Sequence, residues 1–511
     1  MNTTLKRMAT LVLAMILALS CFAFVACSDD TPDQPSTPDQ PDTPGMDTPG
    51  TSAGDTTPDD EVTAGTDYIM SIPKQNLGKD YVLMTSDGHH TEIYIEDEDE
   101  AAGDTMDTAK FYRTNRVEEH LGIDVINSPS PGGWGNRVEY MTRIRQSFST
   151  GDQDYHLGTC YEAFAAEGAI EGFYYDVNSI ECVDLSNSWY VQGWNDSMIV
   201  NDRAYVILSD LSMGMWERMN VLYFNKQLSE QLGITDTLYT LAEDGEWTLE
   251  MMMSCAEQIG QDDGNDLWDE NDTYGICFNR FNCRAMLTYF DIPLTRMNDD
   301  GEYELCLYNE RTETIFGTLH SYMFDTDYVY MNLGDDGDYT VTRPMFMEDR
   351  LLFLPARLLD SQELRAMEGD FGILPIPKFD MNQENYRTHS DDTMTVFFLP
   401  AHTLDAEFCG VGLDALSAEN KFSVVPTYYD IVLKGRTTKD EQSGRMIDIA
   451  RDNMSYDFAF GHITAMDFMW TSFGNALSRE ANTSYKPTYD AEASKYEAKL
   501  EEIMDAYWDV R

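Results

Sequence analysis

The pattern of apolar and polar positions divides the chain into three parts. An uncharged apolar run covers residues 8–25, directly after the basic pair Lys6 and Arg7. Residues 28–67 contain almost no apolar side chains, and from Tyr81 onward short apolar segments alternate with segments of helical spacing. The pattern therefore predicts an export leader, an unfolded connector and a large folded region.

Strand-like and helical segments alternate at the start of the folded region. Residues 81–84 form a short apolar run, residues 108–121 have helical spacing, and residues 123–126 are largely apolar again after Gly122. The apolar positions of the predicted helix are Ala109, Tyr112, Val117 and Leu121. Strand, helix and strand in this order predict a βαβ unit and a parallel sheet.

The alternation continues through the later segments. Strands are predicted at 204–208 and 221–224, and helices at 226–232, 248–259 and 491–508. Thr248 is expected to cap the second of these helices. The whole pattern predicts an α/β fold with a helical C-terminal region.

The leader ends in the arrangement that lipoprotein processing requires. The small residue Ala26 follows the apolar run and precedes Cys27, whose thiol can take a diacylglyceryl group. The stretch resembles a lipobox, with Phe24 in the place where Leu is usual. We expect residues 1–26 to be removed and Cys27 to anchor the protein on the extracellular face of the cell membrane. An uncleaved anchor, or processing at Cys21, would leave the folded region on the same side.

Residues 27–67 are expected to form a disordered stalk that begins at the lipidated cysteine. They consist largely of Thr, Pro, Asp, Gln, Gly and Ser, with the sequence Thr-Pro-Asp-Gln-Pro at 31–35 and at 37–41. Such a segment buries too little apolar surface to offset the entropy lost on ordering. At about 3.1 Å per residue, a proline-stiffened stalk reaches on the order of 100 Å.

Composition and charge exclude several kinds of partner. The chain has 511 residues, of which 42% are hydrophobic, so it can build a large core over two or three domains. A net charge of −57 repels nucleic acid and anionic lipid head groups, so membrane contact is expected through the anchor only. Of the nine cysteines, seven lie beyond Cys27 without CxxC spacing, which favours buried free thiols over a disulfide framework.

Five short motifs follow one another along the folded region. They lie at 115–125, 221–226, 245–248, 370–378 and 428–434. The first resembles an opening in which a helix is followed by Gly-Ile and a strand. The others resemble, in order, a strand that ends in Tyr-Asn-Lys, a Gly-x-Trp-Thr turn, a Gly-x-x-Pro-x-Pro segment and a Tyr-Tyr-Asp signature. This succession is similar to that of the extracellular solute-binding lipoproteins of ABC importers, in the class that includes maltose-binding protein.

The resemblance implies a periplasmic-binding-protein-like fold, with two discontinuous α/β lobes, a hinge and a ligand cleft between the lobes. On this basis residues 68–511 are expected to form one solute-binding domain. The first lobe would comprise about 68–209 and 340–405, and the second about 213–339 and 406–511.

The resemblance also implies a function without bond chemistry. A monomer would capture a solute, with an oligosaccharide as the leading candidate, and deliver it to a membrane permease and its ATPase. A cell-surface glycan-binding adhesin is the alternative, and a surface glycoside hydrolase is the enzyme alternative. The sequence contains no HExxH, GxSxG or Walker A motif, which disfavours the enzyme.

Aromatic and polar side chains near the expected hinge are candidates for ligand contact, because aromatic faces pack on sugar rings and polar groups bind the hydroxyls. The candidates are Trp189, Tyr190, Trp194, Asp210, Trp216 and Trp470. For any single tryptophan, burial in the core is the alternative, and for Asp210 the alternative is a helix cap.

One acidic loop has the oxygen-rich composition of a calcium site. Counted from Gln261, the donors at places 3, 5, 7, 9 and 12 are Asp263, Asn265, the Leu267 carbonyl, Asp269 and Asp272. The loop resembles a degenerate EF-hand or dockerin-type loop, with Gln261 in place of the usual first Asp and Asp266 in place of the invariant Gly. A structural Ca²⁺ is therefore a candidate cofactor, and a solvated acidic turn is the alternative.

Overall fold

A computed structural model describes residues 74–86, 90–334, 339–429, 431 and 441–509. The predicted leader, Cys27 and the predicted stalk lie outside these residues. Within the described part of the chain, no helix combines the length and the apolar character needed to cross a membrane. The seven cysteines of this part are free thiols, as predicted, and one of them, Cys182, is exposed.

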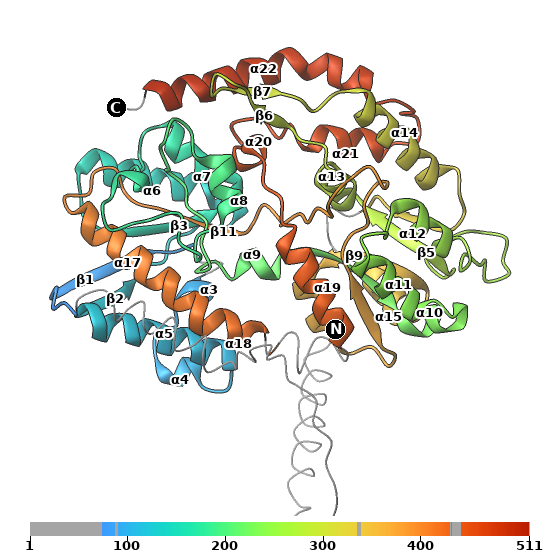
Figure 1. The fold of residues 1–511 in the computed structure, drawn as a ribbon, viewed down its shortest axis with the longest axis horizontal. Coiled ribbons are helices and arrows are strands. Elements are labelled where there is room, and N and C mark those ends of the chain that lie inside the picture. The colour runs from blue at the N-terminus through green and yellow to red at the C-terminus, as the bar shows by residue number, and fades with distance from the viewer. Residues whose placement is uncertain (1–73, 87–89, 335–338, 430, 432–440, 510–511) are drawn as a thin grey trace, which may run out of the picture. The chain divides into compact units, whose positions relative to one another are not determined.

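The first lobe is built on a four-stranded sheet in the order β11-β3-β1-β2 (Figure 1). Its strands are β1 (Lys79–Met84), β2 (Ile123–Asn127), β3 (Leu157–Tyr161) and β11 (Thr395–Phe398). Strand β1 runs parallel to β2 and β3, and β11 runs antiparallel to β3. Helix α5 (Thr105–Leu121) lies between β1 and β2 in the chain, so the predicted βαβ unit is confirmed.

Helix α5 ends at Leu121 as its sequence predicts, but it begins at Thr105, three residues before its predicted start, and its buried face differs. The Asp104 side chain caps its first turn, and Gly122 stops it in the left-handed conformation at φ 63°. Tyr112, a predicted core position, is 45% exposed, whereas Arg113 is fully buried. Arg113 donates to the Asn420 side chain at 2.8 Å, and burial lowers the pKa of its guanidinium to about 9. Arg113 can therefore be buried because the fold provides an acceptor for it.

The second lobe is built on a five-stranded sheet in the order β10-β4-β9-β5-β8. Its strands are β4 (Asn220–Asn225), β5 (Tyr274–Asn279), β8 (Val329–Asn332), β9 (Leu351–Arg357) and β10 (Phe371–Leu374). Strand β5 runs parallel to β8 and β9, while β4 runs antiparallel to β9 and β10. The sheet is therefore mixed, as is the first one.

Local predictions near the second lobe are mostly confirmed. Helix α10 (Lys226–Leu232) ends at Gly233. Helix α12 (Leu249–Ala256) is capped by Thr248 and ends three residues before its predicted end. Residues 204–208, predicted as a strand, form none, and this stretch makes a single isolated bridge to β11.

Sheet membership changes the predicted lobe boundaries. The sequence places residues 340–405 in the first lobe, yet β9 and β10 lie in the second sheet. Helix α17 (Ala406–Glu419), expected in the second lobe, packs on the first sheet, where the Tyr81 hydroxyl donates to the Cys409 carbonyl at 2.7 Å. The physical reason is that β9 pairs with β4 and β5, which are distant in sequence, and strand pairing of this kind leaves no local signal.

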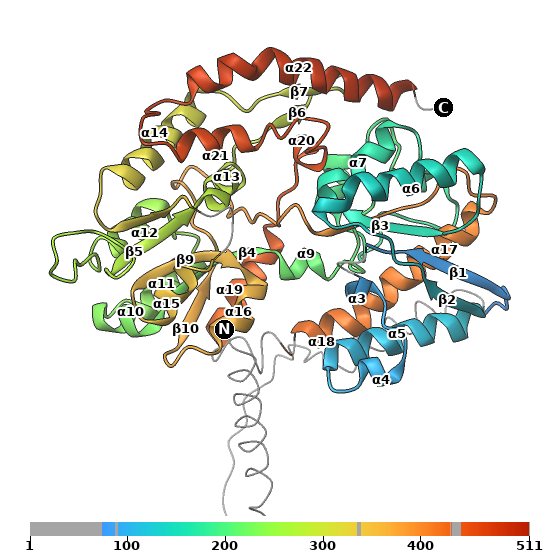
Figure 2. The same ribbon diagram turned by 180° about the vertical axis from the view of Figure 1, so that it is seen from behind.

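Residues 209–219, 388–394 and 453–457 run between the two lobes (Figure 2). The buried carboxylate of Glu92, in the first lobe, holds the first of these segments through the Gly214 amide at 2.6 Å. The second segment forms isolated β-bridges with residues of the first segment and of the third. The crossings are therefore hydrogen-bonded to one another and to the first lobe.

A further group of elements packs against both lobes (Figures 1 and 2). Its elements are β6 (Thr295–Met297), β7 (Tyr303–Leu305), α14 (Glu310–Phe324), α20 (Phe458–Gly461), α21 (Thr471–Leu477) and α22 (Lys486–Asp509). In α22, Tyr507 packs on Tyr205 of the first lobe at 5.7 Å between ring centroids, and Tyr489 stacks on Tyr308 at 5.1 Å. The predicted C-terminal helix is confirmed, and Tyr496, Leu500, Ile503 and Tyr507, which recur at helical spacing, are buried.

Candidate functional site

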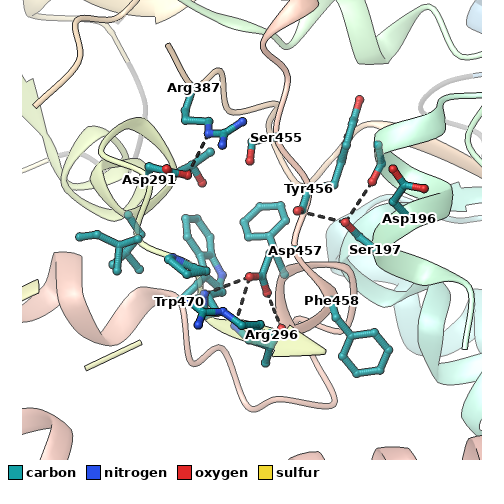
Figure 3. A pocket seen from close by; sticks show the side chains of 18 of the residues that line it. Asp196, Ser197, Asp291, Arg296, Arg387, Ser455, Tyr456, Asp457, Phe458 and Trp470 are labelled. Atoms are coloured by element: carbon teal, nitrogen blue, oxygen red, sulfur yellow. Dashed lines mark hydrogen bonds and ion pairs between the residues drawn. The ribbon is translucent and has the colours of Figure 1, made fainter. Parts of the chain in front are cut away.

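A cavity of about 460 Å³ lies where the two lobes meet the further group of elements that contains β6, α20 and α21 (Figure 3). The first lobe lines it with helix α8 (Gln192–Met198), and the second with helix α13 (Arg280–Tyr289) and residues 291–294. The rest of the wall consists of β6, Tyr303, Arg387, residues 454–458, Phe460 and Trp470. Because both lobes contribute, a ligand held here would contact each of them.

One carboxylate of the wall is fully engaged in holding the backbone. Asp457 accepts hydrogen bonds from the amides of Leu294 at 2.9 Å, Thr295 at 3.1 Å and Ala459 at 2.9 Å, and from the Thr295 hydroxyl at 2.9 Å. Burial raises the pKa of Asp457, and these hydrogen bonds oppose the rise. Since a carboxylate has about four lone-pair positions, Asp457 positions the wall and has little capacity left for a ligand.

A paired arginine and aspartate form one side of the cavity rim. Arg387 Nε donates to Asp291 Oδ1 at 2.8 Å, and the two side chains are 33% and 45% exposed. Asp291 has a left-handed backbone with φ 55°, which Asp and Asn adopt more readily than most residues. Asp196 of α8 is also exposed and lies on the opposite side of the cavity (Figure 3). Charged groups therefore reach the rim from both lobes.

Aromatic rings line the inner wall. Trp470 packs edge-on against Phe460 at 5.3 Å, and its buried indole Nε1 has no hydrogen-bond partner among the described residues. Tyr303 stacks on Phe458 at 4.1 Å and donates its hydroxyl hydrogen to the Ser197 carbonyl at 2.7 Å. Aromatic surface beside a few polar groups is the composition that suits a sugar ring.

Three of the predicted ligand contacts lie in the first-lobe core. Trp189 and Tyr190 both donate to Asp414 Oδ1, at 2.9 and 2.8 Å. Trp194 is 1% exposed, and its Nε1 donates to the Val206 carbonyl at 2.9 Å. None of the three lines the cavity, and their contacts correspond to the core alternative.

Two more candidates lie in the crossing region, outside the cavity. Asp210 accepts from Lys421 Nζ at 2.9 Å, and burial raises the pKa of its carboxyl while Lys421 opposes the rise. Trp216 packs edge-on against Tyr429, with ring centroids 6.0 Å apart. Of the six predicted ligand contacts, Trp470 alone lines this cavity.

The sequence does not single out the charged residues of the cavity. Asp196, Arg387 and the pair Asp291 and Arg296 come from three separate segments. Each is one charge in a chain with 34 basic and 91 acidic residues. Nothing in local composition or spacing distinguishes them from surface charges, so the fold is needed to find them.

The predicted calcium loop uses its own side chains to hold its backbone. Asp272 is buried, and its two oxygens accept from the amides of Asp263 at 2.7 Å and Asp269 at 2.6 Å. The Asn265 side chain accepts from the Leu267 amide at 2.7 Å. The carboxylate oxygens that come within 4.8 Å of one another belong to Asp262, Asp263 and Asp272. This arrangement fits a self-closed acidic turn, and calcium binding stays a prediction.

No family model and no curated protein matches the chain. Solved structures do match it. The extracellular solute-binding protein from Staphylococcus aureus in complex with maltose is 12% identical, with a TM-score of 0.55 over 83% of this chain and 98% of that one. UspC from M. tuberculosis is 13% identical, with a TM-score of 0.54 over 82% and 100%. The ABC substrate-binding protein from Listeria monocytogenes in complex with cycloalternan is 12% identical, with a TM-score of 0.50 over 82% and 98%.

These similarities confirm the predicted fold. The chain has the two-lobe α/β architecture of the solute-binding proteins that serve ABC transporters. At 12–13% identity the similarity concerns the fold, so the function must be argued from the site.

Proposed function

We propose that the protein is the extracellular solute-binding component of an ABC importer, which captures an oligosaccharide between its lobes and delivers it to a membrane permease and its ATPase. The observation that carries the proposal is the cavity, which combines aromatic and polar side chains from both lobes. The fold supports the proposal, because similar structures were solved in complex with maltose and cycloalternan.

Ligand binding would couple the two lobes. A sugar ring packed on Trp470 would lie against one wall, while Asp196 approaches from α8 on the other (Figure 3). If both sets of contacts form only when the lobes are close, the ligand favours the closed state by its higher affinity for that state. The permease would then recognise closure, and the protein itself would make or break no covalent bond.

The lipid anchor is the second part of the proposal. It is supported by the basic, apolar and small-residue succession that ends at Cys27, and by the proline-rich composition of residues 27–67. In this arrangement the monomeric domain stands off the extracellular face of the cell membrane and can reach its permease.

A thermal-shift screen of the full chain in detergent tests the proposal against oligosaccharides, peptides and common metabolites. A ligand at about 100 times its Kd stabilises the folded state by about 2.7 kcal/mol, which raises the unfolding midpoint. Binding of an intact oligosaccharide supports the importer component. Release of cleavage products would favour the glycoside hydrolase, and binding of polymeric glycan without any short sugar would favour the adhesin.

A further inference from the structure

Two guanidinium groups of the cavity lining keep hydrogen-bond donors available for a ligand. Asp457 already accepts four hydrogen bonds, and the Tyr303 hydroxyl donates to a backbone carbonyl. The Arg296 side chain makes no hydrogen bond or ion pair with another described residue, and in this part of the chain the Arg387 side chain bonds only through Nε. Asp196 and the second carboxylate oxygen of Asp291 are available as acceptors, so the cavity offers a ligand both donors and acceptors, with two guanidinium groups among the donors.

The cavity also differs from the whole chain in its balance of charge. Its lining contains three arginines and three aspartates, which cancel formally. The whole chain has 34 basic and 91 acidic residues, and a net charge of −57. The lining is therefore formally neutral, and an anion meets less repulsion there than over the acidic chain as a whole.

We propose that the cavity selects an oligosaccharide that carries an anionic group, either a carboxylate or a sulfate ester, and that Arg387 and Arg296 bind this group. The inference rests on the proposed function and names its substrate class. An anionic group only accepts hydrogen bonds, and a guanidinium presents parallel donors that match the oxygens of a carboxylate or sulfate. A neutral sugar could donate to Asp196 and Asp291, but it would offer the two guanidinium groups no charge to pair with.

The size and the apolar wall of the cavity argue for a sugar rather than for a free anion. A volume of about 460 Å³ lies within the range of small-molecule sites, and an inorganic anion would leave most of it unfilled. Tyr303 and Tyr456 of the lining are half-buried and provide aromatic surface, which the C–H face of a sugar ring covers. The volume and the aromatic surface together indicate a sugar, and the two arginines indicate its acidic substituent.

Asp291 acts against the bound anion in this arrangement. It fixes Arg387 through the 2.8 Å hydrogen bond to Nε, but it also places a negative charge beside the guanidinium. Asp291→Asn removes the charge and suits the position, because Asn tolerates the left-handed φ of 55°. This variant is expected to bind an anionic sugar more tightly, whereas Arg387→Gln is expected to bind it more weakly.

The test compares matched sugars by calorimetric titration of the full chain in detergent. One pair is trigalacturonate and galactotriose, and the other is a sulfated κ-carrageenan tetrasaccharide and its desulfated form, so the two arms separate carboxylate from sulfate. We expect the anionic member of at least one pair to bind about tenfold more tightly than its neutral partner. Its affinity should fall as NaCl is raised from about 50 to about 500 mM.

Substitutions connect this preference to the named side chains. Arg387→Gln and Arg296→Gln should each weaken binding of the anionic sugar about tenfold and change binding of the neutral sugar less than about threefold. Arg311→Gln is the matched control, because Arg311 pairs with Asp380 at 3.5 Å, with side chains 38% and 34% exposed, and does not line the cavity. This control should leave both affinities unchanged.

The outcomes separate this inference from the proposed function. Equal or tighter binding of the neutral sugars would overturn the anionic substrate class and leave the importer proposal standing. An anionic preference that survives both arginine substitutions would overturn the assignment to Arg387 and Arg296. If neither charged nor neutral sugars bind, the proposed function is overturned, and this inference with it.

Discussion

The carboxylate of Glu92 accepts a hydrogen bond from the Gly214 amide at 2.6 Å, which fixes the first crossing segment to the first lobe. The same carboxylate accepts from the hydroxyls of Ser212 at 3.3 Å and Thr395 at 2.8 Å. Thr395 begins β11, directly after the crossing residues 388–394. The buried Glu92 side chain is therefore hydrogen-bonded both to the first crossing segment and to Thr395, which follows the second crossing segment.

Replacing Glu92 should loosen this junction. We expect Glu92→Ala to lower the free energy of unfolding by about 3 kcal/mol, since several buried donors lose a charged acceptor. Glu92→Gln keeps one acceptor oxygen and should lose less. Urea unfolding measures both, with Glu119→Ala as control, because Glu119 is 83% exposed in a loose pair with Lys74. A loss no larger than that of the control would contradict the assigned role.

Alanine substitution of two predicted ligand tryptophans should have different effects on sugar affinity and on stability. Trp470→Ala removes an aromatic wall of the cavity, so we expect sugar affinity to fall about tenfold, which is about 1.4 kcal/mol. Trp194→Ala empties a core position that is 1% exposed, so it should lower the free energy of unfolding by about 3–5 kcal/mol and leave the affinity of the folded protein unchanged. Calorimetric titration measures the sugar affinity of both variants, and urea unfolding measures their free energy of unfolding. The reverse result would place the site near Trp194.

The elements that the sequence predicts correctly carry their own boundary signals. Gly122 ends α5, Thr248 caps α12, and Gly233 ends α10. Each signal acts within one helical turn, so it can be recognised without the fold. The lobe membership of β9 has no such signal, because it depends on pairing with β4 in a register set by distant residues.

The site was harder to predict than the fold for a related reason. Trp189 and Trp194 have the residue type that a sugar site needs, but their Nε1 groups are bonded inside the first lobe. Whether an indole packs in a core or lines a cleft depends on tertiary contacts. Arg387 and Asp291 pair over a long sequence separation, and an isolated charge in an acidic chain gives no local indication of such a partner.

The acidic loop provides a direct test of the calcium prediction. Because Asp272 accepts from two backbone amides of the loop, we expect Asp272→Asn to lower the unfolding midpoint to a similar extent in Ca²⁺ and in EDTA. The parent chain should have the same midpoint in both. A midpoint that rises with Ca²⁺ in the parent and not in the variant would contradict the self-closed turn and support the sequence-based calcium site.

The anchor prediction concerns Cys27 and can be tested on intact cells. We expect Cys27→Ser to release the protein from the membrane, because the serine hydroxyl cannot take the lipid that the thiol takes. In Triton X-114 partition the parent chain should enter the detergent phase and the variant the aqueous phase. Cys21→Ser is the matched control and should behave like the parent. A Cys27→Ser protein that stays in the detergent phase with its leader attached would indicate an uncleaved anchor.

A buried histidine makes stability depend on pH. His462 is 1% exposed, with Nδ1 2.7 Å from the Phe458 carbonyl and Nε2 2.9 Å from the Tyr507 hydroxyl. The neutral ring satisfies both contacts if Nδ1 donates to the carbonyl and the hydroxyl donates to Nε2. Burial lowers the pKa of His462 to about 4, whereas in an unfolded chain it is about 6.5.

The sign of the pH effect follows from these two values. Between about pH 6.5 and about pH 4 the unfolded chain binds a proton at His462 that the folded chain does not, so falling pH should reduce stability by up to about 1.4 kcal/mol per unit. His462→Gln cannot bind that proton, so its stability deficit relative to the parent should shrink as the pH falls through this window. Urea unfolding of both proteins at several pH values measures the difference. A difference that stays constant with pH would mean that folding does not exclude the proton from His462.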